Sequence, residues 1–175
     1  MIMYRDLLIK AKCHLTHHEE HDYKNINDLF VNGGRWMQNR MNELNGNIKS
    51  ADLTFEFKFY GYLKYGISII LTVLSALLFD HLSPFLIPLS VLVFYLAEVH
   101  FAFIFPLIID DCKHPIASSF RVTYQTGFFT VLLNVVPIAA YMLSGIFSRK
   151  EPFQKWHIGC MAIIIWYQNE IRNRL

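Results

Sequence analysis

The sequence has few cysteines and little net charge, and both shortages exclude classes of function. Its three cysteines, Cys13, Cys112 and Cys160, match neither zinc-site nor CxxC spacing, so we expect plain thiols. A net charge of +2 is too small to favour a nucleic-acid partner. There is no GxSxG, Walker or HExxH motif, and residues 1–13 do not resemble a signal peptide. These absences favour a non-catalytic protein that binds no nucleic acid.

What the chain does have is apolar residues, and they are unevenly placed. Apolar residues make up 54 % of the sequence, above the usual share for a soluble domain. Residues 1–58 are polar and balanced, with eight Lys/Arg against eight Asp/Glu, whereas long apolar runs begin near residue 59. We therefore expect an N-terminal cytoplasmic region of amphipathic helices (1–58) and a transmembrane helical bundle (59–175).

Four runs are long enough, or nearly so, for a helix to cross the roughly 30 Å apolar core of a bilayer. They are residues 60–79, 84–108, 122–146 and 154–172, of which the last is the shortest. Pro84 is suited to the first turn of the second run, and Pro115 cannot continue it. The fold predicted is thus all-α, a polytopic integral membrane protein with about four transmembrane helices.

The distribution of basic residues predicts an orientation. With four spans and the N-terminus inside, thirteen Lys/Arg are cytoplasmic and three lie outside. Because cytoplasmic loops are enriched in Lys and Arg, we expect both termini on the cytoplasmic side, in a bacterial inner membrane. Arg149 and Lys150 lie in the outer loop and weaken this pattern.

Three polar residues in the apolar runs form a predicted intramembrane site: Glu98, His100 and Asn134. A carboxylate exposed to lipid costs about 2.5–3.5 kcal/mol, so Glu98 should face protein or water. Glu98 and His100 are roughly 200° apart on a helix, and Asn134 is a plausible partner for one of them. The site either senses or conducts ions or protons, or simply fixes helix register by a hydrogen bond.

Charged residues also gather at the predicted cytoplasmic mouth of the second and third runs. Asp110, Asp111 and Arg121 are its main members, and Arg121 can pair with either aspartate across the loop. Interfacial charge balance is the simplest interpretation.

The N-terminal region contains a histidine cluster. Residues 2–22 have the periodicity of an amphipathic helix, with Tyr4, Leu7, Leu8, Ala11 and Leu15 on one stripe. His14, His17, His18 and His21 follow in an arc beside that stripe. Histidines at i and i+4 can grip zinc or iron, and the HxxHH string resembles the histidine boxes of membrane desaturases and hydroxylases. No second box exists, so a pH-responsive strip or a polar helix border remain alternatives.

Two further segments carry local predictions. Residues 27–47 form a second amphipathic helix, which we expect to break at Gly33–Gly34 because each glycine costs about 1 kcal/mol in a helix. Residues 52–60 alternate like a strand, but no partner strand is evident. An interfacial, helical segment that runs into the first span is our preferred interpretation.

The leading functional hypothesis is an oligomeric membrane sensor, anchor or channel-like subunit that engages a soluble cytoplasmic partner. Amphipathic faces that need cover support a homo-oligomer. The Ile-, Asn- and Phe-rich composition is typical of AT-rich bacterial genes, which include membrane subunits of phage-defence and immunity systems. Two alternatives remain: a metal-dependent membrane oxidoreductase built on the His14–His21 cluster, and an ion- or proton-conducting pore.

Overall fold

The computed structural model describes residues 3–15, 29–46, 52–145, 147 and 152–174, and within these residues every element is helical. The α-helices are α1 (Tyr4–Leu15), α2 (Leu29–Asn45), α3 (Thr54–Leu82), α4 (Ser90–His100), α5 (Ile104–Ile109), α6 (Pro115–Thr126), α7 (Phe128–Leu143) and α8 (Pro152–Trp166). A 3₁₀ helix, η2 (Pro84–Leu89), precedes α4. A wide π turn, η3 (Tyr167–Ile171), and a short 3₁₀ turn, η4 (Arg172–Arg174), extend α8. The all-helical prediction is therefore confirmed for the described residues.

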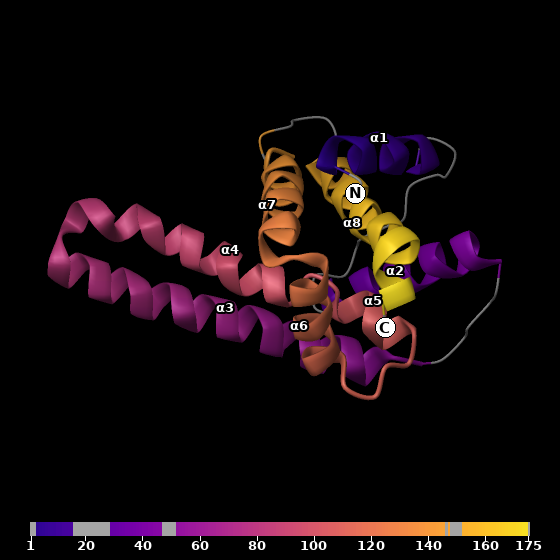
Figure 1. Cartoon of the computed structure of the whole chain (residues 1–175), viewed down its shortest axis with the longest axis horizontal. Helices are drawn as coiled ribbons and strands as arrows, with labels where there is room; N and C mark the ends of the chain where they lie inside the picture. The colour runs from indigo at the N-terminus through magenta and orange to yellow at the C-terminus, as the bar shows by residue number, and fades with distance from the viewer. Residues whose placement is uncertain (1–2, 16–28, 47–51, 146, 148–151, 175) are drawn as a thin grey trace.

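The molecule has two parts of different shape. The long helix α3 and the returning helix α4 form an antiparallel hairpin that projects well beyond the other helices (Figure 1). We call α3, η2 and α4 the hairpin. Helices α1, α2 and α5 to α8 gather at its base and form the body. The two termini of the chain both lie in the body (Figure 1).

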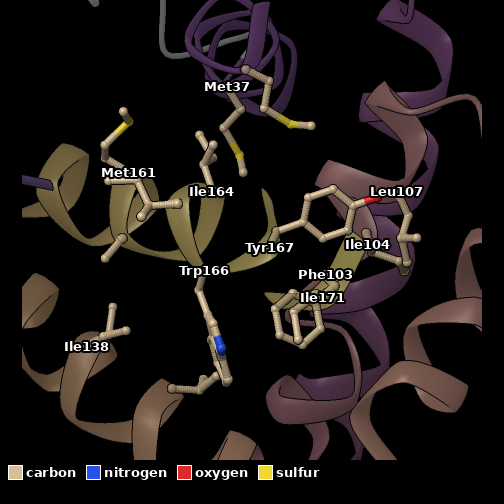
Figure 2. Packing of buried hydrophobic residues seen from close by; sticks show 14 of the residues in the cluster. Met37, Phe103, Ile104, Leu107, Ile138, Met161, Ile164, Trp166, Tyr167 and Ile171 are labelled. Carbon is tan, nitrogen blue, oxygen red and sulfur yellow. The ribbon is translucent and has the colours of Figure 1, made fainter. Parts of the chain in front are cut away.

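The body is organised around α8. This helix packs against α1, α2 and α7 and then continues into the π turn. Its side chains Met161, Ile164 and Trp166 meet Met37 of α2 and Ile138 of α7 in one continuous core (Figure 2). Burial of large apolar side chains stabilises such a core by about 1.5–3 kcal/mol each, so α8 is a structural centre of the protein.

Many large apolar side chains of the hairpin are exposed, whereas large apolar side chains of the body form a buried core. Only 11 % of the most apolar stretch of α3 is buried, whereas 50 % of the most apolar stretch of Pro84–Ile109 is buried. These two segments are long and apolar enough to cross a membrane, in agreement with the first two predicted spans.

The third and fourth predicted spans differ from the structure. The run 122–146 is divided at Gly127, where α6 and α7 meet at a bend of 105°. Gly127 has φ = +96°, a left-handed conformation that side chains disfavour. The segment from α8 to Arg174 is not among the helices that meet the length and composition of a span. Among the described residues, two helices meet the length and composition of a span, or three if the bent pair is counted as one.

The N-terminal helices α1 and α2 pack against the other helices of the body. The predicted stripe of α1 is buried, with Leu7 and Ala11 fully inside, and α8 and α7 of the same chain cover it. The stripe therefore has an intramolecular cover, which removes one argument for an oligomer. The boundary predicted from composition at residues 58–59 falls inside α3.

The predicted break at Gly33–Gly34 is wrong, because α2 runs uninterrupted from Leu29 to Asn45. Close packing between α2 and α3 explains why position 34 is a glycine. A Cβ atom on Gly34 would overlap the ring of Phe57 in α3, whereas a Cβ atom on Gly33 would meet nothing within 4 Å. In the same interface, a Cβ atom on Gly61 would lie 2.6 Å from the Phe30 ring. Each helix thus has a glycine at the point where a phenylalanine ring of the other helix packs against it.

The alternating segment 52–60 is helical from Thr54 and runs directly into the long helix, as we expected. Residues two apart lie about 200° apart on a helix, so Phe57 does not share the face of Phe55 and Phe59. Phe57 is fully buried, whereas Phe55 and Phe59 are exposed.

Candidate functional site

The most unusual polar feature of the described structure is an ion pair buried at the base of the hairpin. Lys64 Nζ of α3 lies 2.9 Å from Glu98 Oε2 of α4, and both side chains are nearly inaccessible. Ser68 Oγ shares its single proton between Glu98 Oε1 at 3.1 Å and the carbonyl oxygen of Lys64 at 2.9 Å. Both oxygens of the Glu98 carboxylate therefore have a partner.

The aromatic ring of Tyr65 completes the surroundings of the lysine. Lys64 Nζ lies 5.2 Å from the centre of that ring, within the range of a cation–π contact. A buried charge is costly unless it is paired and hydrogen-bonded, and here these conditions are met. The arrangement fixes the register of α3 against α4, because a slide of one turn would separate the two charges.

The position of this pair follows from the hairpin itself. Lys64 and Glu98 each lie 17 residues from His81, which stands at the turn between the two helices. Residues equidistant from the turn of an antiparallel helical hairpin meet at the same height. Lys64 lies inside the first predicted span, residues 60–79, and no partner for it was predicted from the sequence. This mirror spacing is the signal that could have identified it as the partner of Glu98.

His100 faces a different neighbour, as its angular separation from Glu98 predicts. Its Nδ1 lies 2.7 Å from the Leu96 carbonyl oxygen, and since a carbonyl can only accept, Nδ1 carries a proton. Its Nε2 lies 3.1 Å from the hydroxyl of Tyr124 in α6. The rings of Phe120 and Phe128 lie 4.8 and 5.3 Å from the imidazole. His100 thus connects the end of α4 to the α6–α7 bend.

The contact between α4 and α6 also compensates for an interruption of the helix in the second apolar segment. Helix α4 ends at His100 and α5 begins at Ile104, so the carbonyl groups before the gap lose their regular helical partners. Ser119 Oγ donates to the His100 carbonyl at 2.6 Å, and Thr123 Oγ1 donates to the Val99 carbonyl at 3.4 Å. Hydroxyl groups of α6 therefore stabilise an interrupted helix in an apolar setting.

The three predicted intramembrane residues are only partly brought together. Glu98 binds α3, His100 binds α6, and Asn134 is buried on α7. The hydrogen bonds described above for Glu98 and His100 are made to other residues, and a contact of either with Asn134 stays a prediction. The residues missed by sequence reasoning are Lys64, Ser68, Ser119 and Tyr124, which are the partners actually found.

The predicted cytoplasmic mouth is also arranged differently. Arg172 Nη2 donates to Asp110 Oδ1 at 2.9 Å, and the hydroxyl of Tyr167 donates to Oδ2 at 2.9 Å. Asp110 thus joins the end of α5 to the end of α8, and a pairing of Arg121 with either aspartate across the loop stays a prediction. Asp111 and Arg121 are exposed.

The histidine cluster lies mostly outside the described residues. His14 is exposed on α1, and His17, His18 and His21 fall in the range 16–28, which the structure does not describe. In the described part of the chain, no three His, Cys, Asp or Glu side chains are placed to hold a metal ion. Zinc or iron binding by the cluster stays a prediction.

Comparison with known protein families, with curated proteins and with solved structures finds no match to this chain.

Proposed function

We propose that this protein is a membrane anchor. Its hairpin inserts into a bilayer and holds the helical body, together with a soluble partner bound to that body, at the cytoplasmic face of a bacterial inner membrane. The observation that carries the proposal is the exposure of large apolar side chains around the hairpin.

The exposed residues surround the hairpin on its outer faces. On α3 they spread over roughly 220° of the helix circumference, and the remaining face packs on α4. They are Ile69, Ile70, Leu71, Val73, Leu74, Leu77, Leu78 and Leu82 on α3, and Phe85, Ile87, Leu89, Val91 and Leu92 on the returning arm. A surface helix of a soluble protein has a polar face, and this hairpin has none, so lipid is its natural surroundings.

Polar groups mark the two ends of this apolar zone. Asp80 and His81 are exposed at the tip, and the buried pair Lys64–Glu98 lies at the base. No Asp, Glu, Lys or Arg lies between Lys64 and Asp80, a distance of about 24 Å along the helix. Helix α3 as a whole has 29 residues, about 44 Å, so it can cross the roughly 30 Å apolar core of a bilayer with its charged residues at the two ends. The ion pair accordingly lies near the level at which the hairpin leaves the lipid.

The basic residues support the same orientation. No Lys or Arg lies between Lys64 and Lys113, so the tip side of the hairpin carries none of the sixteen. Basic residues are retained on the cytoplasmic side of a membrane, which favours a cytoplasmic body and an external tip.

The test compares two isoleucines of similar exposure. Ile70 on the hairpin is 59 % exposed, and Ile9 on α1 of the body is 63 % exposed. We expect Ile70→Glu to lower the fraction of protein that resists alkaline extraction from membranes, because a carboxylate at this depth costs about 2.5–3.5 kcal/mol. Ile9→Glu should leave that fraction unchanged. Equal behaviour of the two variants, or a wild-type protein that alkali extracts, would overturn the proposal.

A further inference from the structure

We infer that α7 lies in the plane of the membrane, at the base of the hairpin, with one apolar face in contact with lipid. This inference rests on the proposed function, and it adds a second lipid-binding surface to the protein. It replaces the expectation that residues 122–146 cross the bilayer.

One face of α7 is largely uncovered by the helices that the structure describes. Phe129, Leu133, Ala140 and Leu143 are exposed, and Val136 between them is half-buried. Their spacing of three and four residues places them on a single stripe. The opposite face carries Val131, Asn134, Val135 and Ile138, all of them buried. The exposed stripe contains no polar residue and is continuous for the whole helix.

The position of α7 directs this stripe toward the membrane. Helix α7 packs on α8 and α1, which lie on its far side from the tip of the hairpin, and its lower end rests on α4 (Figure 1). Its direction is across the hairpin, not along it (Figure 1). The face that α8 and α1 leave open therefore looks toward the side into which the hairpin projects.

The dimensions of α7 agree with an in-plane position. Its 16 residues are about 24 Å long, shorter than the roughly 30 Å that a span requires. At Gly127 the chain turns by 105° into α6, so α6 does not extend it to that length. Exposed aromatic residues stand near both ends, Tyr124 and Phe129 at one and Phe147 and Trp156 at the other. Tyrosine and tryptophan favour the level of the lipid headgroups.

The charge distribution supports the same conclusion from the sequence. If α7 crossed the membrane, the segment between α7 and α8 would lie outside with Arg149, Lys150 and Lys155. With α7 in the plane, all sixteen Lys and Arg residues are on the side of the body. The in-plane arrangement thus removes the exception to the positive-inside pattern.

The experiment measures depth along the stripe. Single cysteines replace Phe129, Leu133, Val136, Ala140 and Leu143 in a full-length chain whose Cys13, Cys112 and Cys160 are alanines. Each is labelled with a nitroxide, and the protein is placed in vesicles of phosphatidylcholine and phosphatidylglycerol. Collision with oxygen and with a water-soluble nickel complex then reports the depth of each label. Labels at Leu74 and Leu92 serve as the hairpin reference.

We expect a flat profile: all five α7 labels at the headgroup boundary, and both hairpin labels deeper. A label at position 136 that lies far deeper than those at 129 and 143 would show that α7 crosses the bilayer and would overturn the inference. Labels on α7 that lie in water would also overturn the inference. Spin–spin broadening at position 133 that disappears on dilution with unlabelled protein would overturn it as well, because a second copy of the chain would then cover the stripe.

The hairpin labels separate this inference from the proposed function. If Leu74 and Leu92 labels are immersed while the α7 labels are in water, the anchor stands and the in-plane helix fails. If the hairpin labels are themselves in water, the anchor fails. A cysteine at the exposed position 147 adds a second readout. A membrane-impermeant maleimide should reach it from the same side of the membrane as the native, exposed Cys13, and labelling from opposite sides would contradict the in-plane position.

Discussion

The hairpin and the body are both rich in aliphatic residues, yet they use them in opposite ways. Ile163 to Trp166 on α8 are covered by neighbouring helices, whereas Ile69 to Leu71 on α3 are exposed. The body joins distant segments through several polar contacts, such as Tyr167 and Arg172 with Asp110. The hairpin has one such anchor, at its base. Similar composition therefore forms a protein core in one region and an exposed apolar surface in the other.

Breaking the anchor at the base should have the largest effect. Glu98→Leu leaves the Lys64 ammonium buried without a counter-charge, and we expect the free energy of unfolding in mild detergent to fall by about 3–5 kcal/mol. Denaturant titration followed by circular dichroism measures the change.

The control for this change removes both charges. Lys64→Leu combined with Glu98→Leu should recover most of the lost stability, because apolar residues of similar volume commonly replace a buried pair without loss. A double variant as unstable as Glu98→Leu would show that the instability has another origin.

Two truncations of similar size contrast the two regions directly. Ile164→Ala in the fully buried core of the body should lower the free energy of unfolding by about 2–5 kcal/mol, since it opens a cavity. Leu77→Ala on the exposed surface of the hairpin should change it by less than about 0.5 kcal/mol. Chemical denaturation in the same detergent measures both. Comparable losses would mean that Leu77 packs against protein, and the contrast between hairpin and body would not hold.

The join between the regions is tested by neighbouring glycines of α2. Gly34→Ala should destabilise the protein by about 1–3 kcal/mol, because the added methyl group overlaps the Phe57 ring of α3. Gly33→Ala has open space and should stabilise the helix by up to about 1 kcal/mol. The melting temperatures of the two variants should therefore move in opposite directions. A rise for Gly34→Ala would show that α2 does not pack closely on α3.

The sequence predicted local structure well, but it did not predict which side chains contact one another. Spacing predicted the α1 stripe, and the angular separation of Glu98 and His100 correctly placed them on different faces. Glycine propensity predicted a break in α2 that does not occur, since propensity reports the cost of Gly34 without the packing of Phe57 that requires a small residue there.

The candidate site shows the same limit. Glu98 was identified from sequence because a carboxylate in an apolar run is exceptional. Its partner Lys64 was not, because their meeting depends on where the hairpin turns. The sequence likewise did not identify Arg172 as the partner of Asp110, because the two residues are 62 positions apart in the chain.

By itself, the sequence determined that the chain is helical and that two long apolar segments flank the turn near His81, because periodicity and apolar length are local properties of the chain. Only the tertiary structure decided which apolar faces are covered, that Lys64 meets Glu98, and that the third apolar run bends at Gly127. Each of these depends on contacts between residues far apart in sequence, and a helix that is apolar all round gives no local sign of whether protein or lipid will surround it.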